Sequence, residues 1–338
     1  MNRISTPLIS LFLTLSLAGA AQAQAAALSF SAALAQSSQQ PSVVSARAAL
    51  ATAQDDYAKA KADPLGTKVT LLKAQQAYEL AVATLKAADA QADSQIVAAY
   101  TQVLEAQDAV KVSGAALSLA QKSAQVAQTQ FQKGGGTEIS AQVAQNGVQA
   151  AQQSAQVAAD GLGLATANLR SLVGNFTSVA AIPASALPAG VGPAVVETVI
   201  GRSAPLIQAQ QAVAALQLQV NLLDPLAVSA SQITAVKTQL QQAQSGAANA
   251  ARGFRIQAQG LYNAYVQAGK NRAVKTVALQ NAQRQRSADE GRYAKGLISQ
   301  LGLLQSQIAE QQASLGKEQA DDDALSAYYA LLAGPSGR

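Results

Sequence analysis

The sequence predicts an all-α protein made of long antiparallel coiled-coil hairpins, arranged as two tandem structural repeats with little or no β structure. Ala, Gln, Leu, Val and Ser dominate the 338 residues, and this composition favours long helices with small, closely packed side chains. Apolar residues recur at alternating spacings of three and four, the pattern of knobs-into-holes helix packing. Short sequence motifs of the first half, which serve here as landmarks, recur in the same order in the second half.

The composition also excludes several classes of function. The chain has no Cys, no His and no Trp, and only 4% of its residues are aromatic. It therefore lacks the usual nucleophilic thiol, the usual proton shuttle and the usual transition-metal ligands. Its net charge is only +5, and the basic residues are scattered singly. We expect no enzyme activity, no cofactor, no metal site and no nucleic-acid partner.

Residues 1–23 have the pattern of a secretory signal peptide. Arg3 provides the positive start, residues 8–18 are apolar, and Ala21 and Ala23 form an A-x-A cleavage site. The alternative is an uncleaved membrane anchor, but the apolar run is shorter than the ~20 residues that a spanning helix needs. We therefore expect the protein to be exported and cleaved after Ala23.

The first repeat is expected to cover residues 24–174. Pro41 opens a helix, since proline at the first helical position already has the required backbone angle. This helix ends at a short Asp-Pro-Leu break. From Thr67 to Gln132 the helical pattern is continuous, and a helix of this length would run about 100 Å. Such a length suits a spacer, a stalk or a duct. A Gly-rich turn and a helix of medium length complete the repeat.

The long helix and the medium helix of this repeat have matching heptad seams. Small residues occupy many seam positions, so the helix axes can approach closely while each residue buries little apolar area. Because such a hairpin lacks a core of its own, we favour an assembly of side-by-side helices over a monomeric bundle. The seams contain Ile96, Ala99, Val103, Ala106, Val110, Ser113, Leu117, Ala120, Ala124, Ala127 and Phe131, and then Ala141, Ala144, Val148, Ala151, Ala155, Ala158, Leu162, Ala165, Leu169 and Leu172.

A segment rich in Pro and Gly, residues 175–204, separates the repeats. We expect little regular helix in it, with Val195 and Val196 in a short extended piece. The second repeat is expected over 205–334, followed by a tail at 335–338. Its landmarks match those of the first: Asp63-Pro64-Leu65 returns as Asp224-Pro225-Leu226, Phe131-Gln132-Lys133-Gly134 as Tyr293-Ala294-Lys295-Gly296, and Leu172-Val173-Gly174 as Leu332-Ala333-Gly334.

Polar residues interrupt the apolar rows of the last helix. Gln311, Glu318 and Asp322 stand at positions where the rows continue with Leu, Ile or Tyr. The three carboxylates at 321–323 point in different directions on a helix, so they do not form a paired acid/base site. We expect these carboxylates to be solvated or to interact with charges on a neighbouring helix.

Two Gly turns reverse the chain, at 134–136 and at Gly296. Glycine ends a helix at low cost because it reaches positive φ angles. The triple Gly is not a phosphate-binding loop, since no strand precedes it and no Gly-Lys-Ser/Thr follows. The predicted role of both turns is therefore geometric.

These features together resemble the TolC family of outer-membrane efflux and secretion proteins. Residues 28–34, Leu-Ser-Phe-Ser-Ala-Ala-Leu, with Pro41 after them, resemble the family's mature N-terminus. Residues 292–301, Arg-Tyr-Ala-Lys-Gly-Leu-Ile-Ser-Gln-Leu, resemble the aromatic-x-x-Gly-Leu-x-Ser tip of the family. The resemblance covers nearly the whole mature chain, including the twofold repeat.

The resemblance implies a homotrimer that forms a helical duct and works with a periplasmic adaptor (membrane-fusion) protein and an inner-membrane pump. It makes the linker an equatorial segment and the two turns the periplasmic entrance. Glu138 would then either form a ring that constricts the pore or be a solvated surface side chain, and we favour the second. The implied adaptor-docking residues are Gly134, Gly135, Gly136, Thr137, Tyr293, Gly296, Leu297 and Ser299.

The sequence departs from the family in one respect. Family members insert two strands of a membrane β-barrel between the short and long helices of each repeat, whereas here the helical pattern resumes almost at once. A membrane-spanning strand needs ~9–11 residues, for which neither break has room. We expect simple interhelical turns, with Asp as cap and Pro as helix opener. The residues concerned are Asp63, Pro64, Leu65, Asp224, Pro225 and Leu226.

The leading hypothesis is a TolC-like helical duct component of an efflux or type I secretion assembly, located in the periplasm and associated with the outer membrane. The alternative is a coiled-coil structural spacer of the cell envelope that lacks the barrel. A duct lined by Gln, Ser and Ala has no pocket chemistry, so the sequence identifies no substrate.

Overall fold

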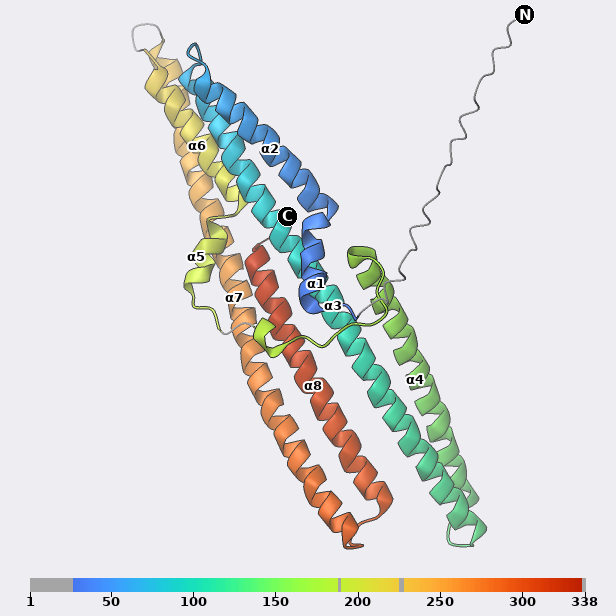
Figure 1. The fold of residues 1–338 in the computed structure, drawn as a ribbon. Coiled ribbons are helices and arrows are strands. Elements are labelled where there is room, and N and C mark those ends of the chain that lie inside the picture. Colours follow the sequence, from blue (N-terminus) through green and yellow to red (C-terminus); the bar gives the residue numbers. More distant parts are fainter. Residues whose placement is uncertain (1–26, 188–189, 225–227, 336–338) are drawn as a thin grey trace, which may run out of the picture.

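The computed structural model describes residues 27–187, 190–224 and 228–335, which form an elongated array of helices (Figure 1). The expected signal peptide, 1–23, lies outside these residues. Within them there is no strand, and a single isolated backbone bridge pairs Leu28 with Val179. The predicted all-α fold is confirmed. The helices are α1 (Phe30–Ala35), α2 (Pro41–Ala62), α3 (Lys68–Gln132), α4 (Glu138–Val173), α5 (Ala194–Ile200), α6 (Ala204–Leu222), α7 (Ala230–Ala294) and α8 (Gln300–Ala333), with 3₁₀ turns at Gln36–Gln39 and Ala184–Ala186.

The two repeats have the same order of helices. α2, α3 and α4 contain 22, 65 and 36 residues, and α6, α7 and α8 contain 19, 65 and 34. Each 65-residue helix is about 100 Å long. The predicted sequence of short helix, break, very long helix, turn and medium helix is therefore confirmed. No described helix is long and apolar enough to cross a membrane.

The helices lie side by side in one layer whose composition changes along its length. α3 contacts α2, α4, α6 and α8, and α7 contacts α5, α6 and α8. Near the hairpin turns the order across the layer is α4, α3, α8, α7, with α4 and α7 at the outer edges (Figure 1). At the other end α2 and α6 replace α4 and α8. Both hairpin turns consequently lie at the same end of the molecule.

The predicted heptad seams form the contact between α3 and α4. Every seam residue named above is buried or half-buried, except Phe131 at the turn, which is 38% exposed. Ile96 and Leu169 are fully buried. Burying a side chain of that size contributes roughly 1.5–3 kcal/mol, whereas a buried Ala contributes much less. The hairpin is thus held most firmly at the end where these larger residues meet.

The main core lies where the first repeat, the linker and α8 converge. Tyr100 of α3 is fully buried there, and its ring meets that of Phe30 edge-on at 5.4 Å. Leu325 of α8 is also fully buried in this cluster, so the core joins the second repeat to the first. Its buried members are Phe30, Ala33, Ile96, Val97, Ala99, Tyr100, Val103, Leu169, Phe176, Val179 and Leu325.

The linker differs from its prediction in one place. Val195 and Val196 were expected in an extended piece, but both lie in α5. Val196, Val199 and Ile200 are buried, and their spacing of three and then one puts them on one helical face. Part of this face packs with Ala258 of α7. The expectation of extended structure was wrong because this tertiary contact outweighs the local preference of valine for strands.

Candidate functional site

The first hairpin tip is shaped by three consecutive glycines. Gly134 has a φ of +74°, which favours glycine, and its N–H donates to the carbonyl of Phe131 at 2.9 Å. The N–H of Gly135 donates to the carbonyl of Gln130 at 2.9 Å, so two of the free carbonyls at the end of α3 are satisfied. A Cβ on Gly136 would come within 3.2 Å of the Phe131 nitrogen. Gly134 is therefore favoured by its positive φ, and Gly136 by the tight contact that a Cβ would make.

Thr137 begins the return helix of this tip. Its Oγ1 accepts from the Ser140 N–H at 3.1 Å, and the Ser140 Oγ accepts from the Thr137 N–H at 3.2 Å. This reciprocal capping box satisfies two N–H groups at the start of α4. The turn between α3 and α4 is consequently fixed at both sides.

The second tip repeats this geometry with different residues. Gly296 has a φ of +69°, and its N–H donates to the carbonyl of Tyr293 at 2.9 Å. The N–H of Leu297 donates to the carbonyl of Arg292, also at 2.9 Å. Ser299 then caps α8 by accepting from the Gly302 N–H at 3.1 Å. The equivalent hydrogen bonds explain why this pair of landmarks recurs in the sequence.

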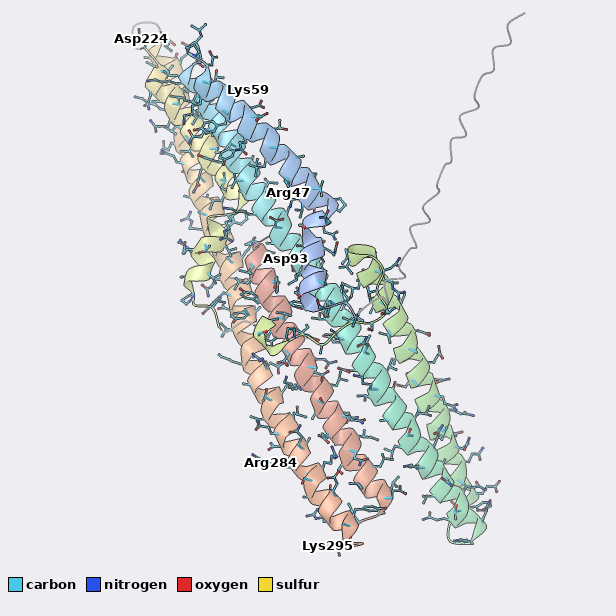
Figure 2. The ribbon with its side chains drawn as sticks, viewed as in Figure 1. Arg47, Lys59, Asp93, Asp224, Arg284 and Lys295 are labelled. Carbon is cyan, nitrogen blue, oxygen red and sulfur yellow. The ribbon has the colours of Figure 1, made fainter. Side chains whose placement is uncertain are left out.

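Apolar side chains are exposed at both tips. In the first, Phe131 is 38% and Ile139 is 74% exposed, and in the second, Tyr293 is 42% and Leu297 is 69% exposed. The structure thus brings the two sets of predicted docking residues to one end of the molecule, where Figure 2 shows Lys295. From the sequence, Phe131 was placed in the heptad seam and in the landmark before the first turn, but neither Phe131 nor Ile139 was predicted to be a docking residue. Their exposed position beside a turn becomes visible only in the structure.

Glu138 is the first residue of α4 and is exposed. It forms no hydrogen bond or ion pair with another described side chain. Its charge is placed favourably at the positive end of the α4 dipole. In a single chain Glu138 therefore has the solvated environment that the sequence analysis favoured.

The Asp-Pro-Leu break of the first repeat is a tight turn. Asp63 ends α2, and its Oδ1 accepts from the Leu65 N–H at 2.9 Å. Leu65 is 91% exposed. Pro64 was expected to open the next helix, but α3 begins only at Lys68, after Thr67 has capped it through the Thr70 N–H at 3.1 Å. The expectation for Pro64 was wrong because Thr67 can accept a hydrogen bond from the first helical turn and proline has no side chain that can.

The equivalent break of the second repeat lies beside the first, at the end opposite to the tips, where Figure 2 shows Asp224. The carbonyl of Asp224 accepts from the Val228 N–H at 3.0 Å, and Ser229 caps α7. Pro225 and Leu226 lie outside the described residues. Neither connection contains a strand among its described residues.

The acidic run of α8 divides into three different environments. Asp321 is 9% exposed and accepts from the Arg272 Nε of α7 at 2.7 Å and from Lys317 of its own helix. Asp322 is 6% exposed, and Asp323 is exposed. The expectation of solvated carboxylates therefore holds only for Asp323. For Asp321 the alternative, an interaction with a charge on a neighbouring helix, is correct.

The carboxyl groups of Asp108 on α3 and Glu318 on α8 lie together where these two helices connect the repeats. The hydrogen bond that Glu318 shares with Asp108, together with burial, raises the pKa of Glu318 to about 7. Burial also raises the pKa of Asp108, but the hydrogen bonds from Glu318 and from Lys111, the latter at 2.6 Å, outweigh it and lower that pKa. This pair was not predicted from the sequence. The available signal was Glu318 itself, which interrupts an apolar row.

Unlike Asp321, Asp322 has no partner of opposite charge among the described side chains. Burial raises its pKa to about 8, and the negative charges of Glu105, Asp321, Glu318 and Asp323 add to the effect. No group of three or more His, Cys, Asp or Glu side chains among the described residues is arranged to hold a metal ion. The junction of α3 and α8 therefore concentrates carboxyl groups without forming a metal centre.

Comparison with solved structures identifies the class of fold, an elongated helical fold that outer-membrane channel proteins share. The outer membrane protein VceC of Vibrio cholerae matches with a TM-score of 0.65 and 16% identity, over 90% of this chain and 96% of VceC. The Campylobacter jejuni CmeC outer membrane channel matches with a TM-score of 0.62 and 11% identity, over 88% and 83%. The outer-membrane channel OprN matches with a TM-score of 0.60 and 16% identity, over 90% of each chain.

No protein-family model matches the sequence, and no curated protein sequence matches it. The chain thus has the fold of outer-membrane channel proteins. This confirms, for the fold, the resemblance to the TolC family.

Proposed function

We propose that this protein is a duct component of an efflux or secretion assembly of the cell envelope. The observation that supports this most directly is the pair of 65-residue helices whose hairpin turns lie at one end, in a fold that outer-membrane channels share. A layer about 100 Å long is suited to span a compartment rather than to enclose a catalytic site. CmeC and OprN, which share this fold, are described as channels, and this supports a function in transport and not in catalysis.

An exposed heptad row on α4 supports assembly of several copies. The row runs beside the α3 seam along α4, and Val143, Val157 and Leu164 in it are 63%, 71% and 74% exposed. At its upper end Gly161 and Leu164 also border a pocket that α3 and α8 share. Its larger apolar residues are separated by small ones, as in a seam that a partner helix fills. The exposed row contains Val143, Gly147, Ala150, Ser154, Val157, Gly161 and Leu164.

The opposite edge of the layer, on α7, has a row with the same spacing. Ile256, Val274 and Val277 in this row are 74%, 64% and 55% exposed. Two different edges that fit each other give a head-to-tail contact, and such contacts close into rings when the rotation allows. The row contains Ile256, Gly260, Asn263, Gln267, Lys270, Val274 and Val277.

The two rows also lie at similar distances from the hairpin tips, measured along their helices. Val157 lies 21 residues after Gly136, and Val274 lies 22 residues before Gly296. At 1.5 Å per helical residue both stand about 30 Å from the turns. We propose that α4 of one copy packs on α7 of the next and that three copies close the duct, the number that the TolC-like fold implies.

Cysteine crosslinking tests this arrangement directly, because the chain contains no cysteine of its own. The double variant Val157→Cys, Val274→Cys, treated with a short bis-maleimide, should give covalent dimers and trimers on a denaturing gel. Within one chain the two positions belong to α4 and α7, the helices at opposite edges of the layer (Figure 1). Val157→Cys alone and the pair Leu65→Cys, Val274→Cys should remain monomeric. A monomer from the first pair as well would contradict the ring.

We further propose that the protein is exported, lies in the periplasm in association with the outer membrane, and presents both tips to a periplasmic adaptor linked to an inner-membrane pump. The exposed Tyr293 and Leu297 support a docking role for the tips. A photo-crosslinking residue at position 297 should capture an adaptor, and one at position 65 should not. Capture from position 65 alone would reverse the orientation, and capture from neither would favour the structural-spacer alternative.

A further inference from the structure

A cavity of about 440 Å³ lies between α3, α8 and the linker, at the junction of the two repeats. Figure 1 shows the linker crossing α3 and α8 on its way from α4 to α5. One side of the cavity is apolar and is formed by Leu104 of α3 and by Val179, Ile182 and Leu187 of the linker. The volume is within the range of about 300–1,000 Å³ that is typical of small-molecule sites.

The other side of the cavity contains more acids than bases. α3 contributes Asp108 and Lys111, and α8 contributes Lys317, Glu318, Asp321 and Asp322. The two lysines are already engaged, Lys111 with Asp108 and Lys317 with Asp321. Asp321 also accepts from Arg272 of α7. The positive charges nearest the cavity are therefore committed to other carboxylates.

Asp322 lines this cavity without any partner among the described side chains. It is only 6% exposed, and its side chain forms neither a hydrogen bond nor an ion pair with any residue that the structure describes. The charged groups that act on it are the carboxylates Glu105, Glu318, Asp321 and Asp323, all of its own sign. An ionised carboxylate without a partner is costly to bury, so a cation delivered into the cavity would relieve this cost.

From this geometry we propose that the cavity binds an organic ammonium ion, with the protonated amine on Asp322 and an apolar body against the linker wall. The described acids are not arranged for a metal ion, and the apolar wall would give a bare cation no contact. This inference is independent of the duct function, because every lining residue belongs to a single chain.

Binding should depend on pH in a characteristic way. Burial raises the pKa of Asp322 to about 8, so at pH 7 this carboxyl holds a proton that an incoming cation must displace. The affinity for a permanently protonated amine should therefore rise up to about tenfold per pH unit between pH 6 and 8. The charged groups around Asp322 and its cavity are Glu105, Asp108 and Lys111 of α3, Arg272 of α7, and Lys317, Glu318, Asp321 and Asp323 of α8.

Isothermal titration calorimetry of the full chain with 4-phenylbutylammonium tests the proposal. At pH 8.5 the amine should bind in a saturable manner, and the neutral isostere 4-phenyl-1-butanol should bind at least tenfold more weakly. At pH 7 binding should release a proton, which appears as a dependence of the measured heat on the buffer. Equal affinities for the amine and the alcohol would overturn the proposal.

Two variants locate the site. Asp322→Asn should weaken amine binding at least tenfold, whereas Asp323→Asn removes the same charge from the exposed neighbour and should change it less than twofold. Ile182→Trp should fill the cavity and abolish binding of both compounds while circular dichroism remains helical. Unchanged amine affinity in Asp322→Asn, or in a folded Ile182→Trp variant, would show that binding occurs elsewhere and would refute the site.

Discussion

The hydroxyl of Tyr100 lies 2.6 Å from the carbonyl oxygen of Ala180 and donates to it from a fully buried position. The same hydroxyl is 2.9 Å from the carbonyl of Leu28. Burial raises the pKa of Tyr100 to about 12, so the hydroxyl keeps its proton and remains a donor at any physiological pH. One side chain of α3 thereby holds the linker and the segment before α1, which are themselves joined where the Ala180 N–H donates to the Leu28 carbonyl at 2.9 Å.

Tyr100→Phe should destabilise the protein by about 1–3 kcal/mol, because the ring stays buried while the Ala180 carbonyl loses this donor. Urea unfolding followed by circular dichroism measures the change. Tyr57→Phe is the matched control, since the Tyr57 hydroxyl forms no hydrogen bond with a described residue and its ring stacks on Tyr78 at 5.8 Å. Equal stability losses in the two variants would contradict a specific role for the Tyr100 hydroxyl.

Thermal stability should fall as pH rises from 5.5 to 8.5. The pKa of Asp322 is raised from 3.8 to about 8 and that of Glu318 from 4.5 to about 7, so the folded chain holds protons that the unfolded chain releases. A raised carboxyl pKa gives stability that is present below the unfolded pKa and lost as pH rises through the folded one. Each pKa unit corresponds to about 1.4 kcal/mol, with Glu318 contributing less because it is more exposed.

Asp322→Asn should remove most of this pH dependence, which differential scanning calorimetry at pH 5.5, 7 and 8.5 can measure. The chain has no histidine, so no other type of side chain with an ordinary pKa titrates in this window. The pKa of Asp108 is lowered, so its contribution to stability is constant across this window. That contribution is lost only as pH falls below about 4. A melting temperature that is flat with pH in the unmodified protein would contradict the prediction.

Gly296→Ala should destabilise the second tip by about 1–2 kcal/mol. The residue has a positive φ, and a Cβ there would have no atom within 4 Å, so backbone strain is the whole cost. Gly291→Ala, five residues earlier inside α7 and equally free of contacts, should instead stabilise by roughly 0.5–1 kcal/mol. Chemical unfolding of the two variants compares them, and the same sign for both would show that the tip is not held in the left-handed conformation.

Adjacent substitutions on α4 should separate folding from assembly. Ala151 belongs to the half-buried seam against α3, so Ala151→Leu should overpack it and cost about 1–3 kcal/mol in an unfolding measurement. Ala150 is exposed in the outer row, so Ala150→Leu should leave the unfolding of a single chain nearly unchanged. In the proposed ring it should weaken trimer formation in sedimentation experiments. Unaltered sedimentation of the Ala150 variant would place the contact between copies elsewhere.

The sequence by itself determined the local features of this fold. The spacing of three and four between small and apolar residues determined the α3–α4 hairpin, because coiled-coil packing repeats the same local contact at every heptad. Glycine at positions 134 and 296 determined where the chain reverses, because those φ angles are unfavourable for other residues. The continuous pattern from Thr67 to Gln132 likewise gave α3 its length, with Thr67 as its cap.

The contacts between the two repeats were decided only by the tertiary structure. Glu318 and Asp322 interrupt an apolar row in the sequence, but no local rule states that Asp108 of α3 and the linker meet them. The helical conformation of Val196 and the burial of Tyr100 likewise depend on segments far away in the chain. Heptad periodicity encodes which face of a helix is apolar and not which distant helix covers it, so the α3–α8 junction and its unpaired carboxyl appear only in three dimensions.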